Sequence, residues 1–359
     1  MLIEKKKLEN ALKYLIRFTE KRTNILESVL INIGVEHTTL FATNTKIGAK
    51  IKIPVKDKNK KSICVPANKL YNILYLIDEN EINFEFIDSN IKISTDSYLS
   101  QIKTYDSNLF PDLFNDIPDA NISIDAELLR NALEKVLFAT AKKSFRPEYE
   151  NINFVVNEQG MSLCATNSFR LSYFKDKTVK TERGIDIIIP KQFILELLGM
   201  PVDEKRLKIG VTDDFLTVEA ENIKLFTRLI SGHFPDYKNI VKDSEEKKLA
   251  TIDATKLLKA IKKVLFIAEK ENYGVMFDFK ENTLSVKSLN QEGEFAKETI
   301  EIEGTEERKI KLNGKMLLEY LPTVSNYRLD LFCESEDTPV KFIPQNVEYT
   351  LKYIQMPIN

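Results

Sequence analysis

Positively charged side chains recur at helical spacing in a stretch near the end of the chain. Residues 252–272 read IDATKLLKAIKKVLFIAEKEN, and the charged positions are Lys256, Lys259, Lys262 and Lys263. At about 100° per residue, these side chains share one arc of a helix and the apolar residues share the opposite arc. Ammonium groups on one face attract phosphates without reading a base sequence. The pattern therefore indicates sequence-independent binding of a phosphate backbone.

Two earlier stretches repeat this pattern. Residues 3–23 carry Lys6, Lys13, Arg17 and Lys21 on the corresponding arc. Residues 124–144 carry Arg130, Lys135 and Lys142 beside two glutamates, so this copy is less basic. Any surface helix has a polar face, and one such helix alone would indicate only a solvated surface. Three similar helices that are basic on one arc, in a chain of net charge -2, favour a shared anionic partner.

The other reactive residue types show no spacing typical of a catalytic or metal site. His37 and His233 have no Cys or carboxylate at ligand spacing, so each is interpreted as structural or exposed. Cys64, Cys164 and Cys333 form no CxxC pair, which is typical of a reducing cytoplasm. Glycine-rich phosphate loops and nucleophile motifs do not occur. We therefore expect no catalytic residue, no metal and no cofactor.

The three basic stretches belong to three long sequence repeats. The copies begin at Ile3, Ile124 and Ile252, a spacing of whole domains rather than of solenoid units. In each repeat a second block leads from a short apolar strand into an amphipathic helix, with alternating strand segments around it. The marker residues of this block are Pro66, Pro190 and Asn313. We expect an α+β fold of three domains, residues 1–120, 121–248 and 249–359.

The amino-terminal sequence predicts a cytoplasmic protein that has no membrane span. Its first ten residues, MLIEKKKLEN, lack the apolar core of a secretory signal. No apolar run in the chain reaches the roughly 18 residues that a membrane helix needs.

Taken together, these features resemble one known family. The three basic helices, residues 163–171 (LCATNSFRL), residues 228–237 (RLISGHFPDY) and the terminal Met356 and Pro357 resemble the bacterial DNA polymerase III beta subunits, the sliding clamps. The resemblance covers essentially the whole chain. It implies a head-to-tail homodimer in which six clamp-fold domains close a ring, with helices lining the pore and antiparallel sheets outside. Such a ring encircles double-stranded DNA and tethers the polymerase for processive synthesis, without catalysis of its own.

The resemblance also implies an apolar cleft for short linear motifs of the DNA polymerase III alpha subunit, the clamp loader and repair proteins. Matching positions in the second repeat are Arg146, Tyr149, Thr166, Ser168, Phe169, Arg170, Leu171, Pro235, Asn239 and Ile240. Those in the third repeat are Met316, Pro339, Ile354, Met356, Pro357 and Ile358. Residues 167–169 replace the common Asp-Gly-His, and Asn239 stands where Arg is frequent. A less positive, more crowded cleft with altered partner preferences is expected.

By the same resemblance, Lys143 joins the residues expected to face DNA. Ile102, Phe266 and Ile267 match the dimer interface of the family, whereas Ser100 stands where a large apolar residue is usual. Two alternatives remain at this stage. One is a three-domain nucleic-acid-binding scaffold that closes no ring, and the other is an enzyme with an unfamiliar site.

Overall fold

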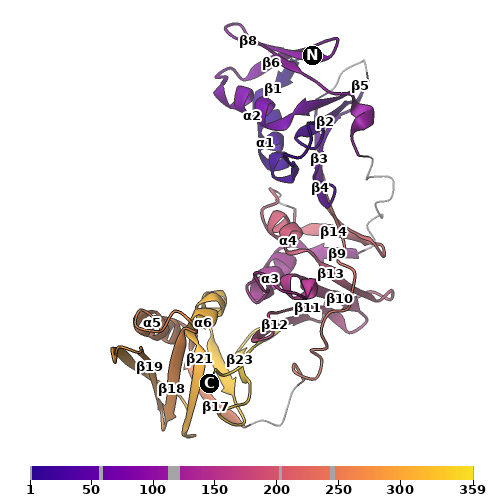
Figure 1. Cartoon of the computed structure of the whole chain (residues 1–359). Coiled ribbons are helices and arrows are strands. Elements are labelled where there is room, and N and C mark those ends of the chain that lie inside the picture. Colours follow the sequence, from indigo (N-terminus) through magenta and orange to yellow (C-terminus); the bar gives the residue numbers. More distant parts are fainter. Residues whose placement is uncertain (1, 56–59, 112–121, 202–203, 243–246, 359) are drawn as a thin grey trace. The chain divides into compact units, whose positions relative to one another are not determined.

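The structure is a computed structural model, and it describes residues 2–55, 60–111, 122–201, 204–242 and 247–358 (Figure 1). The chain divides into two compact units. Unit 1 comprises Met1–Glu127 and Gln192–Leu229, and unit 2 comprises Leu128–Lys191 and Ile230–Asn359. The domain boundary expected after residue 120 lies outside the described residues. The unit borders differ from the repeat borders because each unit is built around a sheet that spans two repeats.

Unit 1 contains one large and one small antiparallel sheet. In order, the large sheet contains β5 (Lys61–Pro66), β2 (Ser28–Ile33), β3 (Thr38–Thr43), β4 (Ile47–Ile53), β16 (Ile223–Arg228), β15 (Phe215–Glu219), β14 (Arg206–Val211) and β9 (Ile122–Asp125). The small sheet contains β1 (Leu2–Glu4), β6 (Glu81–Ile87), β7 (Asn90–Ser94) and β8 (Leu99–Lys103). The pairing of β4 with β16, from Ile47↔Thr227 to Ile51↔Ile223, joins the first repeat to the second.

The helices of unit 1 are amphipathic. They are α1 (Lys5–Leu15), α2 (Ala67–Leu76) and α4 (Lys191–Leu198), of which the first residue falls in unit 2. Helix α1 buries Leu8, Leu12 and Leu15 and packs against α2 (Figure 1). Burial of such leucines, at about 1.5–3 kcal/mol each, fixes which face of α1 remains outside. Lys6, Lys7 and Lys13 consequently lie on the exposed side.

Unit 2 has the same plan. In order, its large sheet contains β13 (Ile185–Ile189), β10 (Ile152–Asn157), β11 (Gly160–Thr166), β12 (Arg170–Asp176), β24 (Thr350–Gln355), β23 (Val340–Pro344), β22 (Arg328–Phe332) and β17 (Lys248–Asp253). Its small sheet contains β20 (Phe295–Glu301), β19 (Thr283–Leu289), β18 (Gly274–Lys280) and β21 (Arg308–Asn313). Here the pairing of β12 with β24 joins the second repeat to the third.

The helices of unit 2 include the two remaining basic stretches. They are α3 (Ala126–Leu137), of which the first two residues fall in unit 1, α5 (Ala254–Val264) and α6 (Gly314–Tyr320). Asp253 caps α5, because its side chain accepts a hydrogen bond from the Lys256 backbone N–H at 2.8 Å. Leu257, Ile261 and Val264 form the buried stripe of α5. None of the helices in the described part of the chain is long and apolar enough to cross a membrane.

The element order repeats three times along the chain. Each repeat runs strand, α-helix, four strands, α-helix and three strands, starting at β1, β9 and β17. The sheets are antiparallel throughout the described pairings. The predicted α+β fold of three similar repeats is therefore confirmed.

Candidate functional site

A tight turn joins β11 to β12 and presents Phe169 to solvent. The Asn167 side-chain oxygen accepts hydrogen bonds from the backbone N–H groups of Phe169, at 3.1 Å, and Arg170, at 3.0 Å. Ser168, which lies between Asn167 and Phe169, has a backbone φ of 75°, in the left-handed region. That conformation costs a residue with a Cβ roughly 1 kcal/mol. The turn leaves the Phe169 side chain 61% exposed, available to a ligand.

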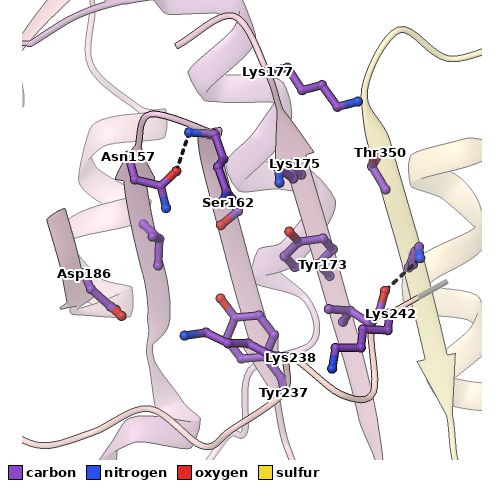
Figure 2. A pocket seen from close by; sticks show the side chains of 14 residues that line it. Asn157, Ser162, Tyr173, Lys175, Lys177, Asp186, Tyr237, Lys238, Lys242 and Thr350 are labelled. Carbon is purple, nitrogen blue, oxygen red and sulfur yellow. Dashed lines mark hydrogen bonds between the residues drawn. The ribbon is translucent and has the colours of Figure 1, made fainter. Parts of the chain in front are cut away.

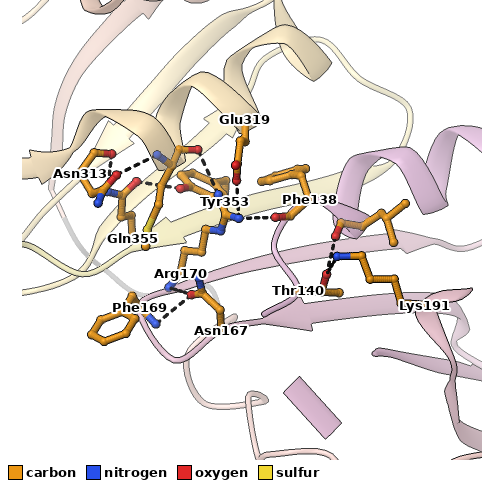
Figure 3. Close-up of polar contacts among 12 residues, drawn as sticks. Phe138, Thr140, Asn167, Phe169, Arg170, Lys191, Asn313, Glu319, Tyr353 and Gln355 are labelled. Atoms are coloured by element: carbon orange, nitrogen blue, oxygen red, sulfur yellow. Dashed lines mark hydrogen bonds and ion pairs between the residues drawn. The ribbon is translucent and has the colours of Figure 1, made fainter. Parts of the chain in front are cut away.

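The next residue, Arg170, connects β12 to the third repeat within unit 2 (Figure 3). Its guanidinium forms an ion pair with Glu319 of α6 at 2.5 Å and donates hydrogen bonds to the carbonyl oxygens of Met316, at 3.3 Å, and Phe138. It also lies 5.4 Å from the centre of the Phe138 ring. The side chain is only 5% exposed. Arg170 therefore holds the surroundings of the turn in place and offers little surface to a ligand.

The carboxyl-terminal segment runs beside this turn. The Met356 N–H donates to the Phe169 carbonyl at 2.8 Å, which extends the pairing of β24 with β12, and the Ile358 N–H donates to the Lys311 carbonyl at 2.9 Å. Met356 is exposed, whereas Pro357 and Ile358 are half-buried. The preceding residue, Gln355, is buried, and its side-chain oxygen accepts a hydrogen bond from the Tyr353 hydroxyl at 2.7 Å. Phe169 and Met356 are thus neighbours on one apolar surface.

Buried apolar residues form the floor beneath that surface. Leu171 and Ile354 pair across β12 and β24 and share one core cluster with Cys164 and Tyr237. The segment after β16 packs on this cluster through Phe234 and Val241. It carries the half-buried Pro235 and the exposed Asn239 and Ile240. Unit 2 consequently brings together the expected cleft residues that lie in the segments 166–171, 235–240 and 354–358. Met316 is connected to this group by the hydrogen bond that its carbonyl accepts from Arg170.

Three other expected cleft residues lie at its margins. Arg146 and Tyr149 belong to the turn around Pro147–Glu150, which packs against β11, and the Arg146 guanidinium lies 5.9 Å from the centre of the Tyr149 ring. Pro339 immediately precedes β23, whose first residue, Val340, pairs with Gln355. The described contacts do not join these three side chains directly to Phe169 or Leu171.

Most residues expected to face DNA are exposed on the outer arcs of their helices or just after them. The exposed set is Lys6, Lys13, Arg17, Lys21, Arg130, Lys142, Lys143, Lys256, Lys259, Lys262 and Lys263. Arg17 forms an ion pair with Glu196 at 2.7 Å. On α5, Lys263 pairs with Glu298 at 2.6 Å and Lys256 with Glu301 at 3.8 Å. Within the described residues, no ion pair involves Lys259 or Lys262.

The prediction that Lys135 is a DNA contact is wrong. Its side chain is 7% exposed, and its ammonium donates a hydrogen bond to the Thr323 carbonyl. Burial lowers the pKa of Lys135, because desolvation disfavours the charged form. Helix α3 packs against the third repeat on this side, which the helical wheel of a single repeat does not reveal.

The residues matched to the dimer interface differ in exposure. The Phe266 side chain, just after α5, is 91% exposed and Ile267 is half-buried. Ile102 is buried within unit 1, and the Ser100 hydroxyl next to it is buried without a hydrogen-bond partner in the described structure. Ile102 and Ser100 lie on β8, one of the two outer strands of its sheet, and β20 is one of the two outer strands of the small sheet in unit 2. Outer strands offer unpaired backbone groups to another chain.

The described side chains offer no metal site, and their cysteines are not activated. No group of three or more His, Cys, Asp or Glu side chains in the described ranges is placed to hold a metal ion. All three cysteines are free and buried. Burial raises the pKa of the Cys64 thiol to about 12 and also raises the pKa of Cys164 and Cys333. Each is held as a neutral thiol, a poor nucleophile.

Comparisons with known proteins place this geometry in a family. The N-terminal, central and C-terminal domains of the DNA polymerase III beta subunit match residues 1–114, 123–236 and 243–359, respectively. The chain belongs to the DNA polymerase III beta subunit family. It is a DNA sliding clamp for the replicative polymerase, which confirms the predicted family and function and disfavours the scaffold that closes no ring.

Individual relatives are distant in sequence and close in fold. The beta sliding clamp of Helicobacter pylori is 26% identical over 351 residues, covering 94% of this chain and 92% of the relative. The DNA polymerase III subunit beta of Pseudomonas aeruginosa superimposes with a TM-score of 0.94 at 20% identity, covering 100% and 99% of the two chains. The sliding clamp of Bacillus subtilis gives 0.92 at 22%, covering 100% and 98%.

The sequence did not reveal the residues that support Arg170. Phe138 lies 32 positions from Arg170 in the sequence, and Met316 lies 146 positions away with Glu319 beyond it. No local spacing in the sequence therefore indicates these partners. The fully exposed Phe145, beside Arg146, was also missed. An aromatic residue within the polar stretch SFRPEYE is a signal that could have identified it.

Proposed function

We propose that two copies of the chain close a ring around duplex DNA through contacts between β8 of one copy and β20 of the other. Each strand lies at one edge of its sheet, and exposed apolar side chains lie on each, Leu99 on β8 and Phe295 on β20. Antiparallel addition of one strand to the other would satisfy the unpaired backbone groups. Phe266 would be covered by the second copy. The cytoplasm is the proposed compartment.

Within this ring, the exposed basic arcs of α1, α3 and α5 would face the DNA. Lysine and arginine side chains neutralise phosphates without base specificity, so the ring can slide. Retention of the protein on DNA then depends on closure of the ring, while the weak phosphate contacts allow the ring to move along the duplex. Family membership and the exposure of the basic set support this arrangement.

The apolar surface of unit 2 would bind linear motifs of the polymerase alpha subunit, the clamp loader and repair proteins. Phe169, Ile240 and Met356 are exposed apolar side chains around the buried pair Leu171 and Ile354. An extended peptide with Leu or Phe anchors fits such a surface, and neighbouring backbone groups fix its direction. Phe169 is one of the residues at which this surface departs from the usual family pattern.

The exposed Phe266 carries the dimer proposal, and its substitution tests it. Phe266→Asp should convert the dimer into monomers at micromolar concentration in sedimentation equilibrium, because a carboxylate would be buried in the interface. Phe145→Asp is the matched control, since Phe145 is also almost completely exposed and lies outside the proposed interface. An unaltered chain that sediments as a monomer, or a Phe266→Asp variant that remains a dimer, would overturn the proposed contact.

A further inference from the structure

A lysine-rich cavity of about 560 Å³ opens on the outer face of the large sheet of unit 2 (Figure 2). We name it the lysine pocket and define it by five of its lining residues. They are Lys175, Lys177, Lys238, Lys242 and Lys352. Figure 2 shows Lys175 on the strand β12 and Lys177 just beyond its end, with Lys238 and Lys242 on the loop that faces the strand. Neither the DNA-facing residues nor the proposed cleft includes any of them.

The lysine pocket continues the floor of the proposed cleft. Side chains two positions apart on a strand share one face. Along β12, Leu171, Tyr173 and Lys175 therefore lie on the same face. Their partners on β24 are Ile354, Lys352 and Thr350, in the same order. One sheet face consequently changes from apolar at the cleft to basic at the pocket within four residues, about 13 Å at 3.3 Å per residue.

One loop borders both sites. The segment after β16 carries Asn239 and Ile240 of the cleft between Lys238 and Lys242 of the pocket. The buried Lys352 fastens this loop to the sheet, because its ammonium donates to the Val241 carbonyl at 2.7 Å. Tyr237 fastens the other side, with its hydroxyl donating to the Asn153 side chain at 2.9 Å. A ligand that leaves the cleft along the sheet meets the lysines next.

Among the described residues, little negative charge offsets the lysine pocket. Asp186 is the one acidic residue among those that line it, and its carboxylate accepts a hydrogen bond from Asn153 at 2.7 Å. Throughout the described part of the chain, no ion pair forms with Lys175, Lys177, Lys238 or Lys242. The Lys242 ammonium donates a hydrogen bond to the uncharged Asn239 side chain at 2.8 Å, so it keeps its net charge. Four ammonium groups without an ion pair around one cavity raise the local concentration of anions.

We propose that the lysine pocket binds acidic residues that flank the docking motif of a partner peptide held in the cleft. This inference rests on the proposed cleft and adds a requirement to its partners. From the strand spacing, Asp or Glu residues should lie about four to six positions from the apolar anchor, since an extended chain covers about 3.3 Å per residue.

A single-stranded nucleic acid fits the lysine pocket less well. Base stacking would require an accessible aromatic face. Tyr237 is buried, packs edge-on against Phe234 with ring centres 5.8 Å apart, and uses its hydroxyl for Asn153. Tyr173 is half-buried beside it, 5.8 Å away between ring centres. Continuity with the cleft also favours a peptide, because the two sites share a sheet face and a loop.

The test uses the full-length chain and two fluorescein-labelled peptides. Both carry the same anchor segment containing Leu and Phe, joined to four Glu in one peptide and to four Gln in the other, with each tail tried at either end. The Glu peptide should bind about tenfold more tightly at low salt in fluorescence anisotropy, and added salt should remove the advantage. Lys175→Gln/Lys177→Gln should abolish this advantage and leave the affinity for the Gln peptide unchanged.

Lys280→Gln/Lys309→Gln is the matched control, because these two exposed lysines lie on the small sheet away from the pocket. This control variant should still bind the Glu peptide about tenfold more tightly than the Gln peptide. If both peptides bind the unaltered chain equally, the inference is wrong and the cleft stands. If neither binds, the cleft proposal fails and the inference fails with it. If Lys175→Gln/Lys177→Gln weakens only an oligo-dT probe, the pocket is a nucleic-acid site and the inference is wrong.

Discussion

Ser168 shows how one residue can set the shape of a binding surface at a cost in stability. Its positive φ allows the three-residue turn that exposes Phe169. The sequence indicated that residues 167–169 depart from the family pattern but not what the departure does to the backbone. Only the structure shows that the central position is left-handed, where a glycine would fit without strain.

Ser168→Gly should therefore stabilise the chain. We expect a gain of about 0.5–1 kcal/mol in the free energy of unfolding, measured by urea denaturation, because the strain at this φ is removed. Ser168→Ala is the control: it keeps the Cβ and should bring no gain. A Ser168→Gly chain no more stable than Ser168→Ala would contradict this explanation.

Arg170 should be irreplaceable by lysine. Arg170→Lys keeps the charge but cannot reach Glu319 and two carbonyl oxygens at once, so a loss of about 2–4 kcal/mol in unfolding free energy is expected. Urea denaturation measures it. Arg146→Lys, at an exposed arginine, should change stability by less than about 0.5 kcal/mol. Equal stabilities of the two variants would show that the Arg170 contacts contribute little.

At the scale of elements, the helical wheel predicted α1 and α5 well and α3 incompletely. For α5, the apolar stripe predicted by the wheel is the stripe that is buried in the structure, formed by Leu257, Ile261 and Val264. The lysines on the opposite side of α5 are therefore exposed. The prediction that Lys135 faces DNA failed because a helix in a multi-repeat chain packs against more than the sheet of its own repeat. Hydrophobic periodicity indicates which residues are buried within one repeat. The contact of Lys135 with Thr323 is made with another repeat, so periodicity does not indicate it.

The lysines of α5 should contribute unequally to DNA binding. Lys259→Gln/Lys262→Gln should weaken binding to a short duplex more than Lys256→Gln/Lys263→Gln, because Glu301 and Glu298 already offset the second pair. Fluorescence anisotropy at several KCl concentrations should show the salt slope of the first variant reduced by roughly 1–2. The reverse ranking of the two variants would place Lys259 and Lys262 away from DNA.

At the scale of the whole molecule, the threefold repetition was readable from sequence and the sharing of sheets was not. Copies of residues 124–144 recur at domain spacing, which predicts three similar units. The pairings of β4 with β16 and of β12 with β24 depend on contacts between repeats, which repeat spacing does not encode. The cleft residues were predictable only through the family resemblance, because the sequence brings distant segments such as residues 166–171 and 354–358 together only in the fold.

Retention on circular and on linear DNA tests the closed ring most directly. Once loaded onto a nicked circular plasmid, the chain should remain bound through gel filtration at moderate salt, since no DNA end is available. A single restriction cut should then release it, because the weak phosphate contacts permit sliding off an end. Equal retention on the circular and the cut plasmid would contradict encirclement and point to ordinary surface binding.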